Sequence, residues 1–303
     1  MNIKELEPTT QSINESIFEE DLSIVVDELV KLDFKEVNKG KEANIRKKYF
    51  FDYINNLKIK LQEIYTWLLN NQNDLNSIYL LGYFNYHGIE ININMQKAFE
   101  LYQKATNLGI GIAQYNLANM YMDGDGIDKN YEKAFELSKK LADKNYSSGI
   151  NLLGFCHDCG IGTNVYKQKA FELYQKAADL GNSHGVNNLG WYYENEFVTG
   201  INKQKAFELY QKAADLENSH GISNLGRCYE KGIGVDANKQ KAFELYQKAA
   251  NLGNRFAQCN LALMYEKGNV IEKDKNQAIY WYKKSAKQGY QYAQNKLNHI
   301  LNE

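Results

Sequence analysis

The chain has 303 residues, of which 44% are hydrophobic, and carries a formal net charge of −1 with a sequence pI of about 6.6. This hydrophobic content suffices for a packed core and excludes wholesale disorder. The balanced charge argues against nucleic-acid binding, which needs a basic surface. The four cysteines form no secreted disulfide framework, the N-terminus lacks the layout of a signal peptide, and no apolar run approaches membrane-spanning length. We expect a cytoplasmic protein without a membrane segment.

Residues 1–75 are predicted to form an N-terminal segment of two or three helices that caps the first repeat of the array that follows. Apolar residues at helical spacing within the first part of this segment indicate one helix. Charged and small residues from Gly40 to Arg46 indicate a break. A second helical pattern runs from about residue 45 to 70, and the polar stretch from Asn70 to Asn76 is typical of a connector.

Residues 76–303 consist of a repeated sequence. The decapeptide KAFELYQKAA occurs three times and has three near copies, all spaced 36 residues apart. A second motif, exemplified by LLGYFNYHG at Leu80 and NLGRCYEKG at Asn224, recurs with the same period. Self-similarity at a fixed period of this length is typical of stacked supersecondary units. The sequence predicts an all-α solenoid of six 36-residue helix-turn-helix repeats plus a terminal helix. Helix A of each repeat carries the second motif, and helix B carries the decapeptide.

The ends of helix B have recurrent local chemistry. A residue that can cap the helix N-terminus precedes it in five repeats, at Asn94, Asn130, Asn202, Asn238 and Asp274. Tyr166 breaks this pattern in the third repeat. Glycines that suit a left-handed residue follow helix B in four repeats, at Gly109, Gly181, Gly253 and Gly289. Asn145 can adopt that conformation in the second repeat, and Glu217 can do so only at a steric cost.

Helix A carries the predicted packing positions. Alanine or glycine fills one column from Ala113 onward and a second column from Gly82 to Ala262, which would let neighbouring helices approach closely, as at Gly221 and Gly226. A third column holds leucine in every copy, including Leu189, and these leucines are predicted to be buried. Since no repeat can bury its apolar face alone, stability should depend on neighbouring repeats.

The pattern A-x-x-x-L-G-x-x-Y-x-x-G, a loop, and D/N-x-x-K-A-x-x-x-Y-x-K-A-A is clear in Gly221 to Ala250 and in Ala257 to Ala286. It resembles the Sel1-like repeat, and the resemblance covers all six repeats. It implies a right-handed superhelix of paired antiparallel helices, related to tetratricopeptide repeats, that acts as an adaptor for other proteins. The fourth repeat departs from the pattern because Glu196, Phe197 and Val198 replace the loop glycines, so we expect its A–B loop to be remodelled.

The segment RKKYFFDYINNLKIKLQEIYTWLLNNQNDLNSIYLLGYFNYHG also resembles a known arrangement. It is similar to the stretch that joins a protein kinase domain to Sel1-like repeats in some fungal proteins. The chain itself has no kinase signature: the HRD and DFG motifs are absent, as is a complete glycine-rich loop. An alternative hypothesis is therefore a regulatory or substrate-recruiting tail of a kinase system.

Cys156, His157, Asp158 and Cys159 could suggest half of a zinc or redox site. Their repeat positions favour another interpretation. Cys156 falls in a column otherwise filled by packing residues, and Cys159 falls in a variable loop column. We therefore predict no metal, no cofactor and no catalytic residue.

The candidate functional surface comes from helix A positions that vary between repeats. By analogy with tetratricopeptide repeats, helix A should line a concave groove, where tyrosine, tryptophan, arginine and asparagine could bind a partner. The predicted groove residues are Tyr79, Tyr83, Tyr86, Tyr115, Asn119, Asn151, Phe155, Asn187, Trp191, Glu194, Arg227 and Glu230. The predicted function is a non-catalytic scaffold or adaptor that presents this groove to a protein or peptide, in intracellular signalling or complex assembly.

Overall fold

The computed structural model of the chain describes residues 10–198 and 200–302, with side chains from residue 21 onward. Within this part of the chain the regular secondary structure is entirely helical. No helix among the described residues is long and apolar enough to cross a membrane. The predicted all-α solenoid class is confirmed.

The N-terminal segment contains α1 (Thr10–Asn38), α2 (Ala43–Leu57) and α3 (Leu61–Asn70). The predicted break between the first two helices is confirmed. The prediction of two or three N-terminal helices is confirmed, and the helical pattern from about residue 45 to 70 is divided between α2 and α3. Lys58 lies between them with a φ of 57°, a left-handed conformation that a continuous right-handed helix does not allow.

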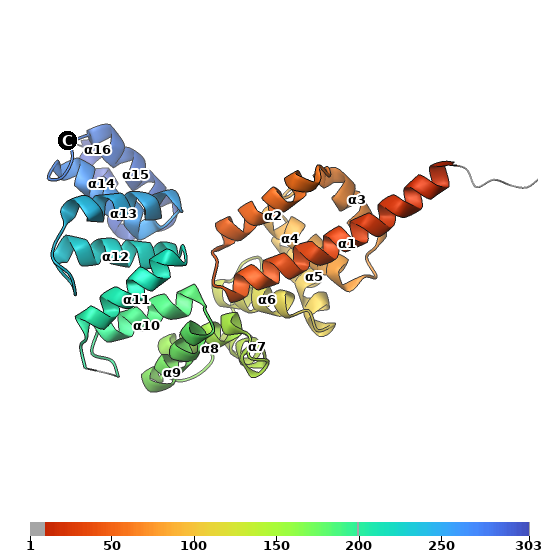
Figure 1. The fold of residues 1–303 in the computed structure, drawn as a ribbon, viewed down its shortest axis with the longest axis horizontal. Helices are drawn as coiled ribbons and strands as arrows, with labels where there is room; N and C mark the ends of the chain where they lie inside the picture. The colour runs from red at the N-terminus through yellow and green to blue at the C-terminus, as the bar shows by residue number, and fades with distance from the viewer. Residues whose placement is uncertain (1–9, 199, 303) are drawn as a thin grey trace, which may run out of the picture. The chain divides into compact units, whose positions relative to one another are not determined.

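The repeats follow with regular helix lengths (Figure 1). Helix A of the six repeats is α4 (Leu75–His87), α6 (Gly111–Asp123), α8 (Ser147–Cys159), α10 (Ser183–Glu194), α12 (Ser219–Lys231) and α14 (Arg255–Lys267). Helix B is α5 (Met95–Asn107), α7 (Tyr131–Asp143), α9 (Lys167–Asp179), α11 (Lys203–Asp215), α13 (Lys239–Asn251) and α15 (Lys275–Lys287). The terminal helix is α16 (Gln291–Asn302).

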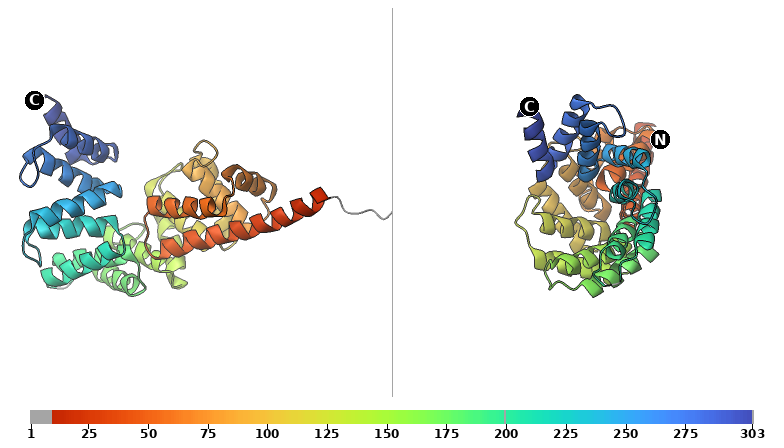
Figure 2. Two further views of the ribbon diagram at one scale, coloured as in Figure 1. Left: turned by 45° about the horizontal axis from the view of Figure 1, so that its top comes forward. Right: turned by 90° about the vertical axis from the view of Figure 1, so that its left-hand side faces the viewer.

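The chain divides into two compact units. Unit 1 comprises Met1–Val37 and Arg46–Leu141, and unit 2 comprises Asn38–Ile45 and Ala142–Glu303. Figure 2 shows the helices of unit 2, coloured green to blue, following one another in chain order. The short segment between α1 and α2 therefore belongs with later repeats that are distant in sequence. The predicted domains, 1–75 and 76–303, divide the chain by its repeat pattern and stay a prediction.

The predicted helix caps are confirmed. The side chain of Asn202 accepts a 2.9 Å hydrogen bond from the backbone amide of Lys205, in the first turn of α11. The same bond forms at the other predicted caps, Asn94, Asn130, Asn238 and Asp274. Tyr166 has nearly the same backbone angles as Asn202 but makes no side-chain cap bond. After helix B, Glu217 takes the left-handed position with a φ of 62°.

Small residues and leucines form the predicted core of unit 2. Leu189 is 2% exposed, and a Cβ added at Gly221 would lie 2.5 Å from the Cβ of Ala213 on α11. A larger side chain at Gly221 would therefore separate α11 from α12. The helix B tyrosines Tyr210 and Tyr246 are also buried in this core.

Candidate functional site

In unit 1 the predicted groove positions of the first repeat are covered. Tyr79 is 0% exposed and Tyr83 is 1% exposed, so their predicted exposure is wrong. The hydroxyl of Tyr79 donates a hydrogen bond to Asp33 of α1. The ring of Phe50 on α2 lies 5.0 Å from that of Tyr83. The N-terminal helices occupy this face of α4 and make it part of the core of unit 1.

The other groove candidates of unit 1, Tyr86, Tyr115 and Asn119, are half-buried, and the side chains of Tyr86 and Asn119 form hydrogen bonds within the unit. The hydroxyl of Tyr86 donates a 2.7 Å hydrogen bond to Asp125. The side-chain amide of Asn119 donates a 2.9 Å bond to the backbone carbonyl of Tyr115 one turn earlier. These contacts stabilise α4 and α6 locally and leave only part of each side chain for a partner.

His87, at the last turn of α4, is held in its neutral form. Its ring lies 4.3 Å from that of Tyr83, centroid to centroid. Burial, together with the nearby charges of Lys47 and Arg46, lowers the pKa of His87 to about 4 against an opposing effect of Asp33. His87 was not among the sequence candidates, because its titration depends on the N-terminal helices that cover it.

In unit 2 a row of asparagines crosses three successive A helices. The side-chain amide of Asn188 donates to the side-chain oxygen of Asn151 at 3.2 Å, and Asn224 donates to Asn187 at 2.9 Å. Asn187 is buried, 9% exposed, and its own amide donates to the side-chain oxygen of Asn188 at 3.4 Å, so its predicted exposure is wrong. Asn151 is half-buried, and one such bond leaves a side-chain amide further capacity for hydrogen bonding. Asn151 and Asn187 were predicted from sequence. Asn188 and Asn224 were missed, although their column is asparagine in four repeats.

An exposed aromatic cluster lies beside this row on the same A helices. Phe155 and Trp191 occupy equivalent positions on α8 and α10, and they are 40% and 37% exposed. Phe197, 41% exposed, stacks on Trp191 with ring centroids 4.5 Å apart. This stacking requires the altered loop of the fourth repeat, where Asn195 is extended at the end of α10 instead of a left-handed glycine. The predicted remodelling of this loop is confirmed.

The acidic candidates are engaged within unit 2. Glu194 forms an ion pair with Arg227 of the next A helix and accepts a 2.8 Å hydrogen bond from the hydroxyl of Tyr210. Burial alone would raise the pKa of Glu194, but Arg227 and Tyr210 outweigh it and hold the pKa below its ordinary value. Glu230 likewise accepts a bond from Tyr246. Because the carboxylates of Glu194 and Glu230 already bond to neighbouring helices, they have fewer free acceptor positions for a partner.

The structure separates the residues of the Cys-His-Asp-Cys stretch. Cys156 is buried, whereas Cys159 is exposed. Asp158 accepts hydrogen bonds from Lys167 and Tyr192 at 2.6 Å each. Among the described residues, no group of three or more histidine, cysteine and acidic side chains is placed to hold a metal ion.

Sequence reasoning missed one further surface. The first residues of α8, α10 and α12 bind the segment between α1 and α2, which is far away in sequence. The recurring Asn-Ser pairs Asn182-Ser183 and Asn218-Ser219 were visible in the sequence as a duplicated pattern. Nothing in the sequence indicated which segment would meet them.

Comparisons with known proteins agree with this fold. The Sel1 repeat family model matches residues 75–110, 111–146, 147–182, 183–218, 219–254 and 255–290. A Sel1 repeat protein from Oxalobacter formigenes is 26% identical with a TM-score of 0.64, and the match covers 77% of this chain and 93% of that chain. A protective antigen of uropathogenic Escherichia coli, c5321, is 28% identical with a TM-score of 0.53, over 80% of this chain and 53% of that chain.

A third similarity extends to the fold alone. The immunity protein Pa5087 from Pseudomonas aeruginosa is 23% identical with a TM-score of 0.53, over 70% of this chain and 81% of that chain. The search of curated proteins gave no significant match. The resemblance of the N-terminal segment to a kinase linker finds no support in these similarities and stays a prediction.

Proposed function

This chain belongs to the Sel1 repeat family, whose helical solenoids generally serve as protein-interaction scaffolds, and we propose that it binds a protein or peptide partner through the A helices of repeats three to five. The observation that supports this most is the exposed cluster of Phe155, Trp191 and Phe197 beside the asparagine row. We propose complex assembly, of the kind used in intracellular signalling, as its role.

The chemistry of the cluster suits a partner with an apolar anchor. Stacking of Phe197 on Trp191 holds both rings in place before binding, which lowers the entropy lost on association. Large aromatic side chains carry much of the binding free energy in protein interfaces. The half-buried amide of Asn151 lies on α8, the helix that carries Phe155, and can bond to a peptide backbone, since an amide both donates and accepts.

The proposal can be tested by proximity labelling in the native cells with quantitative mass spectrometry. The double variant Phe155→Ala/Trp191→Ala should lose the proteins labelled most strongly by the wild type. Tyr280→Ala/Tyr292→Ala is the matched control, because it removes two aromatic side chains that are 47% and 46% exposed on other helices. Circular dichroism verifies that both variants are folded. Equal labelling by wild type and Phe155→Ala/Trp191→Ala would disprove the aromatic cluster as the binding surface.

A further inference from the structure

The A helices of unit 2 begin with a connected row of polar side chains, here called the helix-start row: Ser147, Ser148, Asn182, Ser183, Asn218, Ser219 and Asn254. Each asparagine caps its own helix, as where Asn218 accepts a 2.8 Å bond from the amide of Gly221. Two of these side-chain amides also reach back one repeat: Asn218 donates to the Ser183 hydroxyl at 3.2 Å and Asn254 to the Ser219 hydroxyl at 3.3 Å. The amide of Asn182 donates to the carbonyl of Asn38 instead. The row therefore continues from repeat to repeat.

Residues 38–44, here called the clasp, lie on this row. The carbonyl oxygen of Asn38 accepts bonds from the Ser147 hydroxyl at 2.5 Å and from the Asn182 amide at 3.0 Å. The carbonyl of Lys39 accepts from the backbone amide of Ser183 at 3.0 Å. The clasp thus supplies acceptors to backbone N–H groups that have no partner inside their own helix, and to side chains at the helix starts.

The next part of the clasp repeats these contacts one repeat further on. The carboxylate of Glu42 accepts a 2.8 Å bond from the backbone amide of Ser219, as Lys39 does at Ser183. A carboxylate at this position is also favoured by the partial positive charge of the α12 N-terminus. Lys41 donates to the carbonyl of Leu216 at 3.0 Å, and Asn44 donates to the equivalent carbonyl of Leu252 at 2.7 Å. Successive repeats therefore bind the clasp through equivalent groups.

Gly40 and Glu217 favour the contact between the clasp and the helix-start row, although the repeat pattern does not require either residue. Gly40 has a φ of 72°, and a Cβ there would lie 2.8 Å from the Ser183 backbone nitrogen, so only glycine fits. Glu217 occupies the left-handed position that is glycine in four other repeats, and its carboxylate lies 2.6 Å from the Lys41 ammonium. The ion pair gives a reason for a glutamate where glycine would be less strained.

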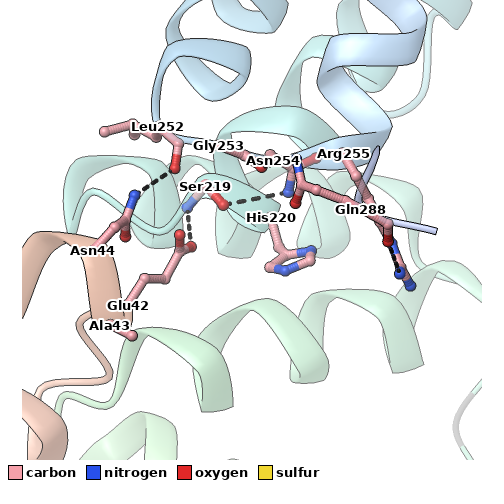
Figure 3. A pocket seen from close by; sticks show the side chains of 10 residues that line it. All are labelled: Glu42, Ala43, Asn44, Ser219, His220, Leu252, Gly253, Asn254, Arg255 and Gln288. Carbon is pink, nitrogen blue, oxygen red and sulfur yellow. Dashed lines mark hydrogen bonds between the residues drawn. The ribbon is translucent and has the colours of Figure 1, made fainter. Parts of the chain in front are cut away.

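A hollow adjoins the Glu42 end of the clasp (Figure 3). Its volume is about 560 Å³, and it is lined by Glu42 and Asn44 on one side and by His220, Asn254 and Arg255 on the other. The clasp ends here, while the helix-start row continues to Asn254. A competing peptide could therefore engage the row at this end before the clasp is released.

We propose that the helix-start row is a second binding surface of this protein and that the clasp is its built-in occupant. The external ligand that fits is a peptide with the chemistry of the clasp: an asparagine, a glycine two residues later, a lysine, and then a glutamate. Such a peptide would bind by displacing the clasp. The row is formed by helix starts and does not include the aromatic cluster of the proposed function, so either proposal can fail alone.

The test uses the full chain and a labelled peptide with the sequence EVNKGKEANIR, measured by fluorescence anisotropy. The variant Lys41→Glu places a carboxylate against Glu217 and should release the clasp. The peptide can bind only when the clasp is released, and the apparent affinity falls in proportion to how rarely that state is populated. Because Lys41→Glu populates the released state more, it should bind the peptide about tenfold more tightly than the wild type. Adding Glu217→Lys restores an ion pair between the clasp and residue 217 and also repels the lysine of the peptide, so the affinity should fall to the wild-type value or below. Lys203→Glu, the same charge change at an exposed residue of α11, should have no effect.

Two further measurements test the specificity of the row for the glycine of the peptide and the release of the clasp in the variants. A peptide in which the glycine is replaced by alanine should not bind the Lys41→Glu variant, since Gly40 has no room for a Cβ. Hydrogen exchange at the Ser183 and Ser219 amides should accelerate about tenfold in Lys41→Glu and in Gly40→Ala, because both amides bond to the clasp. Unchanged exchange in both variants would overturn the docking of the clasp. Faster exchange without peptide binding would overturn the second binding surface.

Discussion

The hydroxyl of Tyr210 on α11 donates a 2.8 Å hydrogen bond to the carboxylate of Glu194 at the end of α10. The same bond links Tyr246 to Glu230 at 2.8 Å in the next repeat. In each case the tyrosine of the repeated decapeptide connects helix B to the helix A that precedes it. The conspicuous decapeptide thus serves packing within each repeat.

Replacing these tyrosines should reveal unequal contributions to stability. Tyr246→Phe removes one hydrogen bond to a carboxylate and should lower the free energy of unfolding by about 1.5 kcal/mol. Tyr210→Phe should cost more, since Glu194 also pairs with Arg227 and is oriented by both partners. Urea unfolding followed by circular dichroism measures both values. Equal stability of the two variants and the wild type would contradict the role of these bonds.

Leu189 tests the core of unit 2. Leu189→Ala should lower the free energy of unfolding by about 2–5 kcal/mol, because the side chain is almost fully buried and leaves a cavity. Leu180→Ala is the matched control, since Leu180 is 45% exposed and should cost far less. Chemical denaturation with linear extrapolation compares the two, and a cost near zero at Leu189 would contradict the core assignment.

Substitutions at two helix-cap positions should change the stability in opposite directions. Asn202→Ala should destabilise the protein by about 1 kcal/mol, because the first-turn amide of Lys205 loses its acceptor. Tyr166→Asn should stabilise it by about 0.5–1 kcal/mol, since the backbone at Tyr166 already has the geometry of the asparagine caps. Thermal melts of both variants give the sign. A Tyr166→Asn variant less stable than the wild type would show that the tyrosine ring contributes more than the missing cap.

His87 predicts a pH dependence of stability. In the folded protein its pKa is lowered to about 4, while in the unfolded chain it returns to its ordinary value of about 6.5. Between these values the unfolded chain binds a proton that the folded protein does not. Stability from this group is therefore complete above pH 6.5 and falls as the pH drops towards 4, by about 3 kcal/mol at most.

The measurement compares urea unfolding of the wild type and His87→Gln from pH 4 to pH 7.5. His87→Gln should lose the pH-dependent part of the stability that comes from His87. The difference in free energy of unfolding between the two proteins should therefore change mainly between pH 4 and pH 6.5. Parallel curves for the wild type and His87→Gln would contradict the lowered pKa.

Most of the fold follows from local patterns in the sequence. Asn202, Gly181 and Leu189 determine where a helix begins, ends and packs through interactions within one repeat or with its neighbour, so the period alone placed them. Tyr79 and Tyr83 could not be placed in this way. Tyr83 occupies a column that is half-buried or exposed in every later repeat, but α2 covers it, and the sequence did not show which face the N-terminal helices would contact. The column of Tyr79 is also buried at Asn187, Ser223 and Cys259, so its burial does not depend on the N-terminal helices alone.

In the candidate site, too, some features follow from the repeat pattern and others depend on contacts that the pattern does not give. The remodelled loop with Phe197 was predictable, because a departure from a repeat is visible in one repeat alone. The pairing of Arg227 with Glu194 depends on side-chain reach between neighbouring helices, which column positions do not give. The clasp depends on contacts over sequence separations such as the 177 residues between Glu42 and Ser219, and no periodicity connects those segments.

The clasp also limits how this array can evolve. Tandem repeats change length by gaining or losing whole units, and a plain array tolerates such events because each unit contacts mainly its neighbours. Lys39 and Glu42 bind helix starts in adjacent repeats, with only two residues between them. A unit inserted between repeats four and five would place its own helix start against Glu42, and it would keep the Lys41 ion pair only if it carried a glutamate at the position of Glu217. Growth by duplication should therefore be tolerated beyond the sixth repeat, whereas a unit inserted within repeats three to five must reproduce the groups that bind the clasp.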